Sequence, residues 1–176
     1  MYWGKRLQPD LFLKDTILSL TPEILAQHNI QGLVLDVDET LVPIKMAQIS
    51  AEILPWIESV RQVTPQIWLV SNNVSESRIH RIAEALNVPY ITGAGKPSRR
   101  KLRRAVTAMK LPADRVAMVG DRLFTDVLAG NRLGMFTVLV KPMNDPAEGD
   151  RKYLIHAIEF RLSRALGAKT TIPDWA

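Results

Sequence analysis

The chain has 176 residues, of which 47% are hydrophobic, and it contains no cysteine. This length and composition suit a single domain, residues 1–176, built around one buried core. Without cysteine, disulfide frameworks, thiolate metal sites and thiol nucleophiles are excluded. No apolar run approaches the ~20 residues of a membrane span, and the N-terminus lacks the apolar core of a secretory signal. We therefore expect a cytoplasmic protein, either fully soluble or peripheral on the inner face of the membrane.

The formal net charge of +5 favours anionic partners such as phosphate groups, acidic lipids or nucleic acid. The positive charge is concentrated in residues 85–113, a stretch that contains no acidic residue. One solvated helix face would explain such a run. The alternative is a patch that binds anions or a membrane surface, formed by Arg99, Arg100, Arg103 and Arg104.

The first 30 residues form a lead-in with one short helix. Thr21 is placed to cap that helix, Pro22 occupies its first turn, and Glu23 follows. From residue 32 onward, short apolar runs alternate with amphipathic stretches. The apolar runs predict buried strands at 32–36, 66–71, 88–92, 115–120 and 135–140.

Helical patterns occupy the intervals between these strands, at about 50–61, 75–87, 98–110 and 123–133. Ser75 lies where an N-terminal cap is expected for the second of them. Strands that alternate with helices indicate crossover connections and a mainly parallel sheet covered on both faces. The predicted fold class is therefore a three-layer, Rossmann-like α/β sandwich.

The C-terminal segment, residues 148–176, is predicted to contain a longer helix up to about residue 167. An apolar stripe runs along this helix at helical spacing, with basic residues around it. Packing on the core of the domain is the expected role of the stripe, and a membrane-surface helix is the alternative. The stripe consists of Leu154, Ile155, Ile158, Leu162, Ala165 and Leu166.

Polar side chains follow four of the predicted strands, at the point where each strand ends. In chain order they are Asp36 with Asp38, Ser71 with Asn72, Lys96, and Asp121 with Asp126. These ends lie side by side in a parallel sheet, so we expect the side chains to converge. Clustered carboxylates repel one another unless a cation lies between them, and oxygen ligands without His or Cys favour Mg²⁺. Asp36 and Asp121 are the predicted ligands, and Asp126 completes or orients the site.

The same residues can be given roles in phosphoryl transfer. Asp36 is the predicted nucleophile, because an aspartate with an ordinary pKa near ~3.9 is ionised at neutral pH. Asp38 can protonate the leaving oxygen and then activate a water, provided that it holds a proton near neutral pH, as neighbouring carboxylates favour. Ser71 and Lys96 can bind the phosphoryl oxygens. Each of these motifs alone could be an ordinary polar turn, but their order along four strand ends is specific.

The pattern resembles the haloacid-dehalogenase (HAD) superfamily over about residues 30–141. Residues 36–42, DVDETLV, resemble its first motif, DxDxT, and Ser71, Lys96 and the segment 120–126 resemble the second, third and fourth. The resemblance implies a Rossmann-like HAD fold, Mg²⁺ as cofactor, an aspartyl-phosphate intermediate and a metal contact from the backbone carbonyl of Asp38. Thr40 and Asn72, which lie within or beside these motifs, are assigned to phosphate binding together with Ser71 and Lys96.

The spacing of the motifs leaves no room for the cap domain that HAD enzymes usually carry. About 25 residues separate Thr40 from the second strand and about 20 separate Asn73 from Lys96. A capless site is open and suits a bulky substrate. The closer resemblance is to HAD subfamily IIIA and its phosphatidylglycerophosphate phosphatases, carried by the Leu-Val-Pro that ends at Pro43, by Lys96-Pro97, and by residues 120–132. It implies an anionic phospholipid substrate and possible peripheral membrane contact.

Two other functions remain open at this point. One is a phosphoprotein or small-molecule phosphatase, although Asp121 with Asp126 departs from the paired aspartates usual in the phosphoprotein enzymes. The other is a non-catalytic module that binds acidic lipid or nucleic acid. The basic run lacks the interleaved aromatic residues typical of RNA-binding modules, so no nucleic-acid partner is expected. The sequence leaves the oligomeric state open.

Overall fold

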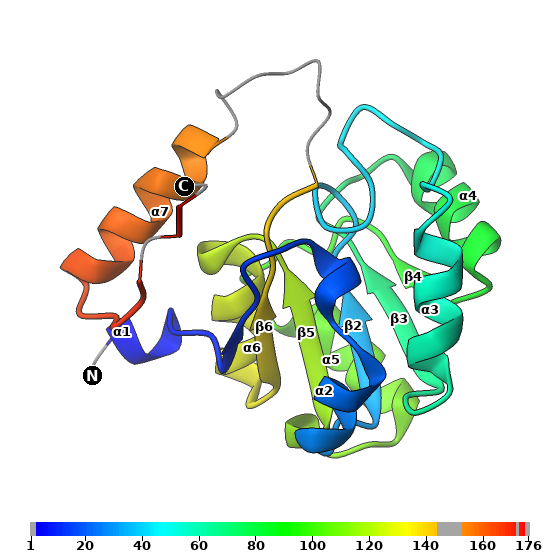
Figure 1. The fold of residues 1–176 in the computed structure, drawn as a ribbon, viewed down its shortest axis with the longest axis horizontal. Helices are drawn as coiled ribbons and strands as arrows, with labels where there is room; N and C mark the ends of the chain where they lie inside the picture. Colours follow the sequence, from blue (N-terminus) through cyan, green and yellow to red (C-terminus); the bar gives the residue numbers. More distant parts are fainter. Residues whose placement is uncertain (1–2, 144–152, 172, 175–176) are drawn as a thin grey trace.

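Six parallel strands form the central sheet of the protein, in the order β1-β6-β5-β2-β3-β4 (Figure 1). The computed structural model describes residues 3–143, 153–171 and 173–174. The strands are β1 (Leu11–Phe12), β2 (Gly32–Leu35), β3 (Gln66–Val70), β4 (Tyr90–Ile91), β5 (Val116–Gly120) and β6 (Phe136–Leu139). Five of them match the predicted strands, and the parallel pairing confirms the predicted fold class.

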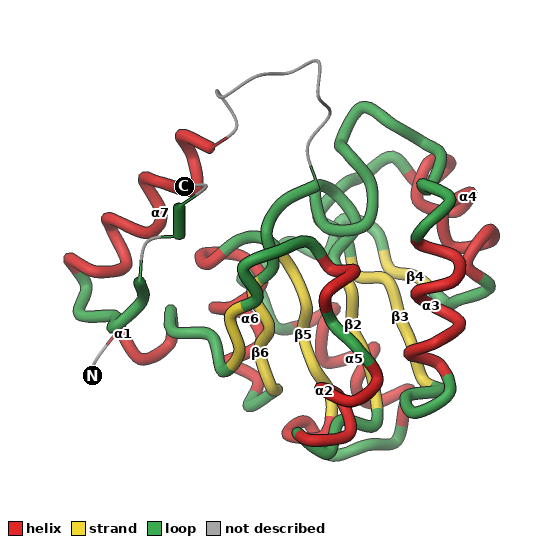
Figure 2. Tube along the Cα trace, in the orientation of Figure 1, coloured by secondary structure: helices red, strands yellow, loops and turns green. Residues whose placement is uncertain are grey.

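Helices cover both faces of the sheet, which gives three layers (Figure 2). One face carries α2 (Pro22–Gln27), α3 (Ile53–Arg61) and α4 (Glu76–Leu86), and the other carries α5 (Arg100–Met109) and α6 (Leu128–Leu133). A single turn of π-helix, η3 (Leu123–Val127), precedes α6. Such turns occur often at functional sites.

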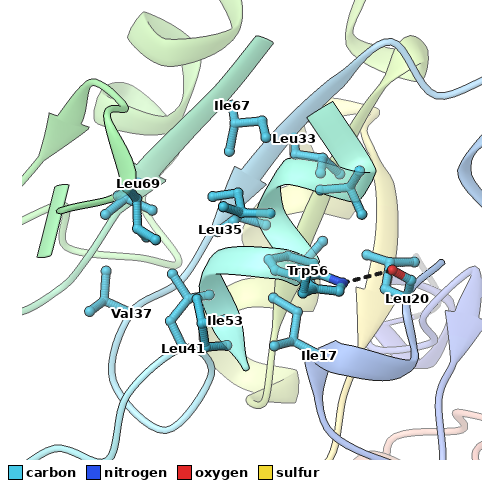
Figure 3. Close-up of a cluster of buried hydrophobic side chains, with 14 of the residues drawn as sticks. Ile17, Leu20, Leu33, Leu35, Val37, Leu41, Ile53, Trp56, Ile67 and Leu69 are labelled. Carbon is cyan, nitrogen blue, oxygen red and sulfur yellow. Dashed lines mark hydrogen bonds between the residues drawn. The ribbon is translucent and has the colours of Figure 1, made fainter. Parts of the chain in front are cut away.

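Successive side chains of the central strands point to opposite faces of the sheet, so the hydrophobic core has one part on each face. In β2, Leu33 and Leu35 pack with α2, α3 and α4, while Val34 packs with α5. Figure 3 shows the first of these clusters, in which the indole Nε1 of Trp56 donates a hydrogen bond to the carbonyl of Leu20 at 2.9 Å. This bond satisfies the polar atom of a side chain that is otherwise buried among apolar neighbours.

The lead-in contributes a strand that the sequence pattern does not predict. β1 pairs with the edge strand β6, with Leu11 beside Val138 and Phe12 beside Leu139. Next to it, the carboxylate of Asp10 accepts hydrogen bonds from the backbone and hydroxyl of Thr137, at 2.8 and 3.0 Å. Two residues are too few to show strand periodicity, so these contacts with β6 decide the pairing.

The two predicted helix caps have different outcomes. The hydroxyl of Thr21 accepts a hydrogen bond from the backbone of Ile24 at 3.4 Å and caps α2 as predicted. Ser75 precedes α4 but makes no side-chain cap bond. Instead, the backbone N–H of Ser75 donates to the side-chain carbonyl of Asn73 at 2.8 Å, so Asn73 orders this turn.

The packing of the C-terminal helix α7 (Tyr153–Ala165) differs from the prediction that its apolar stripe faces the core. Its apolar stripe does not pack on the core: Leu154 is 63% exposed and Ile158 is 54% exposed. The buried face instead consists of His156, Glu159, Phe160 and Ser163. The predicted start of this helix lies outside the described residues. None of the described helices is both long and apolar enough to cross a bilayer.

The connections near the strand ends are short, as the motif spacing predicts. Between Thr40 and β3 the chain forms a loop and α3, and between β3 and Lys96 it forms α4 and β4. Over residues 3–143, therefore, neither connection contains a cap domain. The carboxyl edge of the sheet is left without a covering domain in this part of the chain.

Candidate active site

Four predicted side chains converge at the carboxyl ends of β2 and β5. Lys96 Nζ lies 2.6 Å from Asp36 Oδ1 and 2.7 Å from Asp126 Oδ1. Asp36, Asp121 and Asp126 each place a carboxylate oxygen within 4.8 Å of the others. All four side chains are buried. Adjacent parallel strands explain this convergence, because Asp36 directly follows β2 and Asp121 directly follows β5.

Burial changes the acid–base behaviour expected of Asp36. Removal from water raises the pKa of Asp36 to about 8; Lys96 opposes the rise, while Asp126 and Asp121 add to it. Burial also raises the pKa of Asp121, against the opposing effect of His156. For Lys96, burial acts to lower the pKa, but Asp126 and Asp36 outweigh it and the pKa is raised. The ordinary aspartate pKa expected from the sequence therefore does not hold for buried Asp36.

The donor set fits a hard divalent cation. Three buried carboxylates face one lysine, so the ionised cluster carries excess negative charge that a dication would balance. Oxygen ligands alone, without thiolate, suit Mg²⁺. A cation at this position would also favour the ionised form of Asp36, which a nucleophile requires. Asp36, Asp121 and Asp126 are thus the residues that could hold the metal.

Asn72 holds the loop that presents Lys96. Its side-chain carbonyl accepts from the backbone N–H of Lys96 at 2.7 Å, and its amide donates to the Lys96 carbonyl at 3.1 Å. The hydroxyl of Ser71, which is fully buried, accepts from the backbone of Asn73 at 3.0 Å. An amide has a second N–H and a hydroxyl has its own hydrogen. Phosphate binding by Ser71 and Asn72 therefore stays a prediction that these bonds leave possible.

Thr40 and Gly120 support the carboxylate cluster. The hydroxyl of buried Thr40 donates to Asp121 Oδ1 at 3.4 Å. Gly120 lies so close to the Asp126 side chain that a Cβ at this position would overlap the carboxylate. The backbone N–H of Arg122 donates to Asp126 Oδ2 at 3.2 Å. These contacts set the orientation of two candidate metal ligands.

Asp38 is not part of the cluster, and its side chain has partners that the sequence pattern does not predict. Its Oδ1 lies 2.6 Å from Arg78 Nη1, and its Oδ2 accepts from the amide of Asn73 at 3.1 Å. Arg78 also donates to the carbonyls of Pro43 and Met46. Arg78 therefore ties Asp38 and the loop after the first motif to α4. An acid–base role for Asp38 remains a prediction.

Two further side chains reach the site from α7. His156 Nε2 lies 2.9 Å from Asp121 Oδ2, and both groups are buried. Glu159 Oε1 accepts from Arg122 at 2.6 and 2.9 Å, and Glu159 Oε2 accepts from the backbone of Leu123 at 3.0 Å. The sequence did carry a signal for them: His156, Glu159, Phe160 and Ser163 recur at the spacing of one helix face.

Glu159→Gln is expected to lower the free energy of unfolding by about 2 kcal/mol, because hydrogen bonds to a charged group are lost in a buried setting. Urea unfolding measures this. Glu58→Gln, at an exposed position on α3, serves as the matched control and should leave the midpoint unchanged. Equal midpoints for both variants would show that Glu159 does not anchor the segment after Asp121.

The basic residues near Lys96 form an open hollow rather than one continuous patch. Arg99, Arg100, Arg103 and Arg132 line it together with Ser98, and its volume is about 550 Å³. Arg132 also donates to the carbonyl of Pro97 at 2.9 Å, next to Lys96 in the chain. Arg104, predicted to share the patch, instead lines a separate hollow with Trp68 and Tyr90. We call the first feature the arginine hollow.

Two family models match the chain. The model described as mitochondrial PGP phosphatase, where PGP is phosphatidylglycerophosphate, matches residues 3–90. The HAD-hydrolase-like model matches residues 93–152. The two matches follow one another along the chain and together include all of the predicted motif residues.

Similar proteins of known name are phosphatases. Probable phosphatase YqeG of Bacillus subtilis (strain 168) is 35% identical over 161 residues, which cover 92% of each chain. Phosphatidylglycerophosphate phosphatase 1, chloroplastic/mitochondrial, of Arabidopsis thaliana is 30% identical over 80% of this chain. The match spans 42% of that longer protein.

Solved structures share the fold at low sequence identity. An uncharacterized protein from Listeria monocytogenes serotype 4b has a TM-score of 0.53 and 16% identity, covering 66% of this chain and 84% of the other. A hypothetical protein from Xanthomonas campestris has a TM-score of 0.50 and 16% identity, covering 78% of each chain. With the motif order, the carboxylate cluster and the family matches, these findings lead to one conclusion: the chain belongs to the HAD phosphatases, in the branch that contains the PGP phosphatases.

Proposed function

We propose that this phosphatase hydrolyses the terminal phosphomonoester of phosphatidylglycerophosphate, with Mg²⁺ and through an aspartyl-phosphate on Asp36. One observation carries the chemistry: three buried carboxylates cluster at the carboxyl edge of the sheet, and two of them, Asp36 and Asp126, contact Lys96. The match of residues 3–90 to the PGP phosphatase model supports the choice of substrate.

In the first step, the Asp36 carboxylate attacks phosphorus and the bond from phosphorus to the lipid oxygen breaks. Asp38 gives its proton to that leaving oxygen. In the second step, Asp38 takes a proton from a water molecule that attacks phosphorus, and the bond from phosphorus to Asp36 breaks. Inorganic phosphate leaves, Asp36 is again a carboxylate and Asp38 again carries a proton.

Asp38 must leave Arg78 to perform this role, because its two carboxylate oxygens are already bonded to Arg78 Nη1, at 2.6 Å, and to the amide of Asn73, at 3.1 Å. We propose that an incoming phosphate competes for Arg78 and thereby releases Asp38. Lys96 and Ser71 bind the phosphoryl oxygens, and Thr40 orients Asp121. Mg²⁺, when bound by Asp36, Asp121 and Asp126, supplies charge neutralisation at the phosphoryl group.

Two hollows near the site support an amphipathic, doubly charged substrate. The arginine hollow adjoins Pro97, directly after the phosphate-binding Lys96, and suits the second phosphate of the lipid, the phosphodiester. A separate pocket of about 470 Å³ begins at the loop after the first motif. Its lining is largely apolar and includes Leu18, Leu41, Met46, Ile49 and Met143, together with the charged residues Glu52 and Lys141.

The test is a substrate panel with Mg²⁺: phosphatidylglycerophosphate in mixed micelles, glycerol 3-phosphate, p-nitrophenyl phosphate and a phosphoserine peptide. We expect the highest kcat/KM for the lipid. Faster turnover of the phosphopeptide would replace the lipid with a protein substrate. Hydrolysis of none of the panel would reject the proposal.

The double variant Arg100→Gln/Arg103→Gln is expected to lower kcat/KM for the lipid roughly 10- to 30-fold, because each arginine contributes about 1 kcal/mol toward an anionic lipid. Turnover of p-nitrophenyl phosphate, which has no second phosphate, reports on the intact catalytic centre. Arg104→Gln, on the same helix but at the other hollow, is the matched control. An equal loss in the control would mean that general charge, not the arginine hollow, governs substrate binding.

A further inference from the structure

An exposed apolar stripe runs along α7 and continues to Leu166, just beyond the end of the helix. Leu154 and Ile158 are more than half exposed, and three further large side chains are at least 40% exposed. A contiguous apolar face of this kind on a folded chain indicates an interaction site. The exposed side chains are Leu154, Ile155, Ile158, Leu162 and Leu166.

The short helix α1 (Trp3–Arg6) lies beside the C-terminal end of α7 (Figure 1). Gly4 packs directly on the backbone of Gly167 and Ala168, leaving no room for a Cβ. Its neighbour Trp3 is 53% exposed. Tryptophan is favoured at the boundary between water and lipid headgroups. We call Trp3, the four exposed apolar side chains of α7 and Leu166, which directly follows α7, the α1/α7 surface.

The charges beside this surface select an anionic partner. Arg161, Arg164 and Lys169 are exposed, and the only acidic residue in residues 153–171, Glu159, is buried on the opposite face. Lys5 of α1 is exposed as well. Two copies of this chain joined through the same surface would bring like charges together, which is unfavourable. An apolar stripe with flanking basic residues is instead typical of helices that lie on anionic membranes.

The inner face of the same helix contacts the candidate active site. His156 lies 2.9 Å from Asp121, and Glu159 holds Arg122 and the backbone of Leu123. α7 therefore connects the α1/α7 surface with the segment that follows β5. A helix anchored on a membrane would hold that segment close to the lipid surface.

We propose that the α1/α7 surface docks on an anionic lipid bilayer and keeps the phosphatase site at the membrane that carries its substrate. The inference builds on the proposed lipid substrate, but docking itself is measured by binding alone. It also assigns membrane contact to α1 and α7 rather than to the basic helix α5.

The test is co-sedimentation of the full chain with vesicles of phosphatidylcholine alone and of equal parts phosphatidylcholine and phosphatidylglycerol. We expect binding to the anionic vesicles that weakens with added salt. The double variant Ile158→Gln/Leu162→Gln should bind them at least roughly tenfold more weakly, because the apolar contact is lost while the charge is kept. Arg161→Gln/Arg164→Gln should remove the preference for phosphatidylglycerol.

Leu54→Gln/Val74→Gln replaces exposed apolar residues elsewhere and should bind like the unaltered chain. Circular dichroism and thermal unfolding establish that each variant is folded. Unchanged vesicle binding by the Ile158/Leu162 variant would overturn the proposal. So would a stable dimer that does not bind vesicles and dissociates in this variant, because a second copy would then cover the surface.

The two proposals fail in different ways. If the chain binds anionic vesicles but does not hydrolyse phosphatidylglycerophosphate in micelles, the proposed function is wrong and the docking surface stands. If it hydrolyses the lipid in micelles but binds no vesicles, the docking surface is wrong and the function stands.

Discussion

Replacing Asp36 with asparagine is expected to lower Mg²⁺-dependent phosphatase activity by about 10⁴-fold or more, as loss of a nucleophile does in other enzymes that form covalent intermediates. The amide keeps the shape of the side chain but cannot form the aspartyl-phosphate. It also removes one of the three clustered carboxylates, so the affinity for Mg²⁺ should fall. Turnover of p-nitrophenyl phosphate and of phosphatidylglycerophosphate measures the loss.

The fold of this variant should be preserved. Asparagine replaces a buried carboxyl group whose pKa burial raises to about 8, because the charged form is costly there. Removing this cost offsets the lost contact with Lys96. Asp114→Asn, at an exposed position before β5, is the matched control and should retain full activity. Substantial activity in Asp36→Asn with normal unfolding behaviour would remove Asp36 from the mechanism and place the nucleophile elsewhere.

The sequence predicts the sheet well because buried parallel strands leave a strong pattern. Each central strand is a continuous apolar run that ends at a polar residue, as in Leu35 before Asp36 and Gly120 before Asp121. Once these strands are taken as parallel, their polar ends must meet at one edge. The meeting of Asp36, Lys96, Asp121 and Asp126 therefore follows from local patterns and one topological rule.

The remaining contacts of the site depend on pairs that no local pattern encodes. Arg78 reaches Asp38 across 40 positions of the chain, and His156 reaches Asp121 across 35. Such contacts are set by how whole helices pack. The prediction for α7 was wrong for the same kind of reason, since an apolar stripe was assigned to the core by default. The face with His156 and Glu159 is buried because it has specific partners beside β5.

The second prediction with a large effect concerns Gly120, which has no side chain that could take part in the reaction. Gly120→Ala should raise the Mg²⁺ concentration for half-maximal activity at least roughly tenfold, as loss of support for a metal ligand does. A Cβ at residue 120 would overlap the Asp126 carboxylate, which is 1% exposed and lies 2.7 Å from Lys96 Nζ. Asp126 must then move away from the cluster. Overpacking should also lower the free energy of unfolding by about 1–3 kcal/mol.

Gly134→Ala is a control that separates the effect on Mg²⁺ binding from the loss of stability. Gly134 has a φ of +78° with open space around its Cα, so alanine there strains the backbone without displacing any neighbour. That strain is expected to destabilise the protein by about 1–3 kcal/mol as well. Titration of activity with Mg²⁺ should shift for Gly120→Ala and stay in place for Gly134→Ala. Equal titrations for the two variants would show that the Asp126 position does not control cation binding, and that Asp36 and Asp121 hold the metal without it.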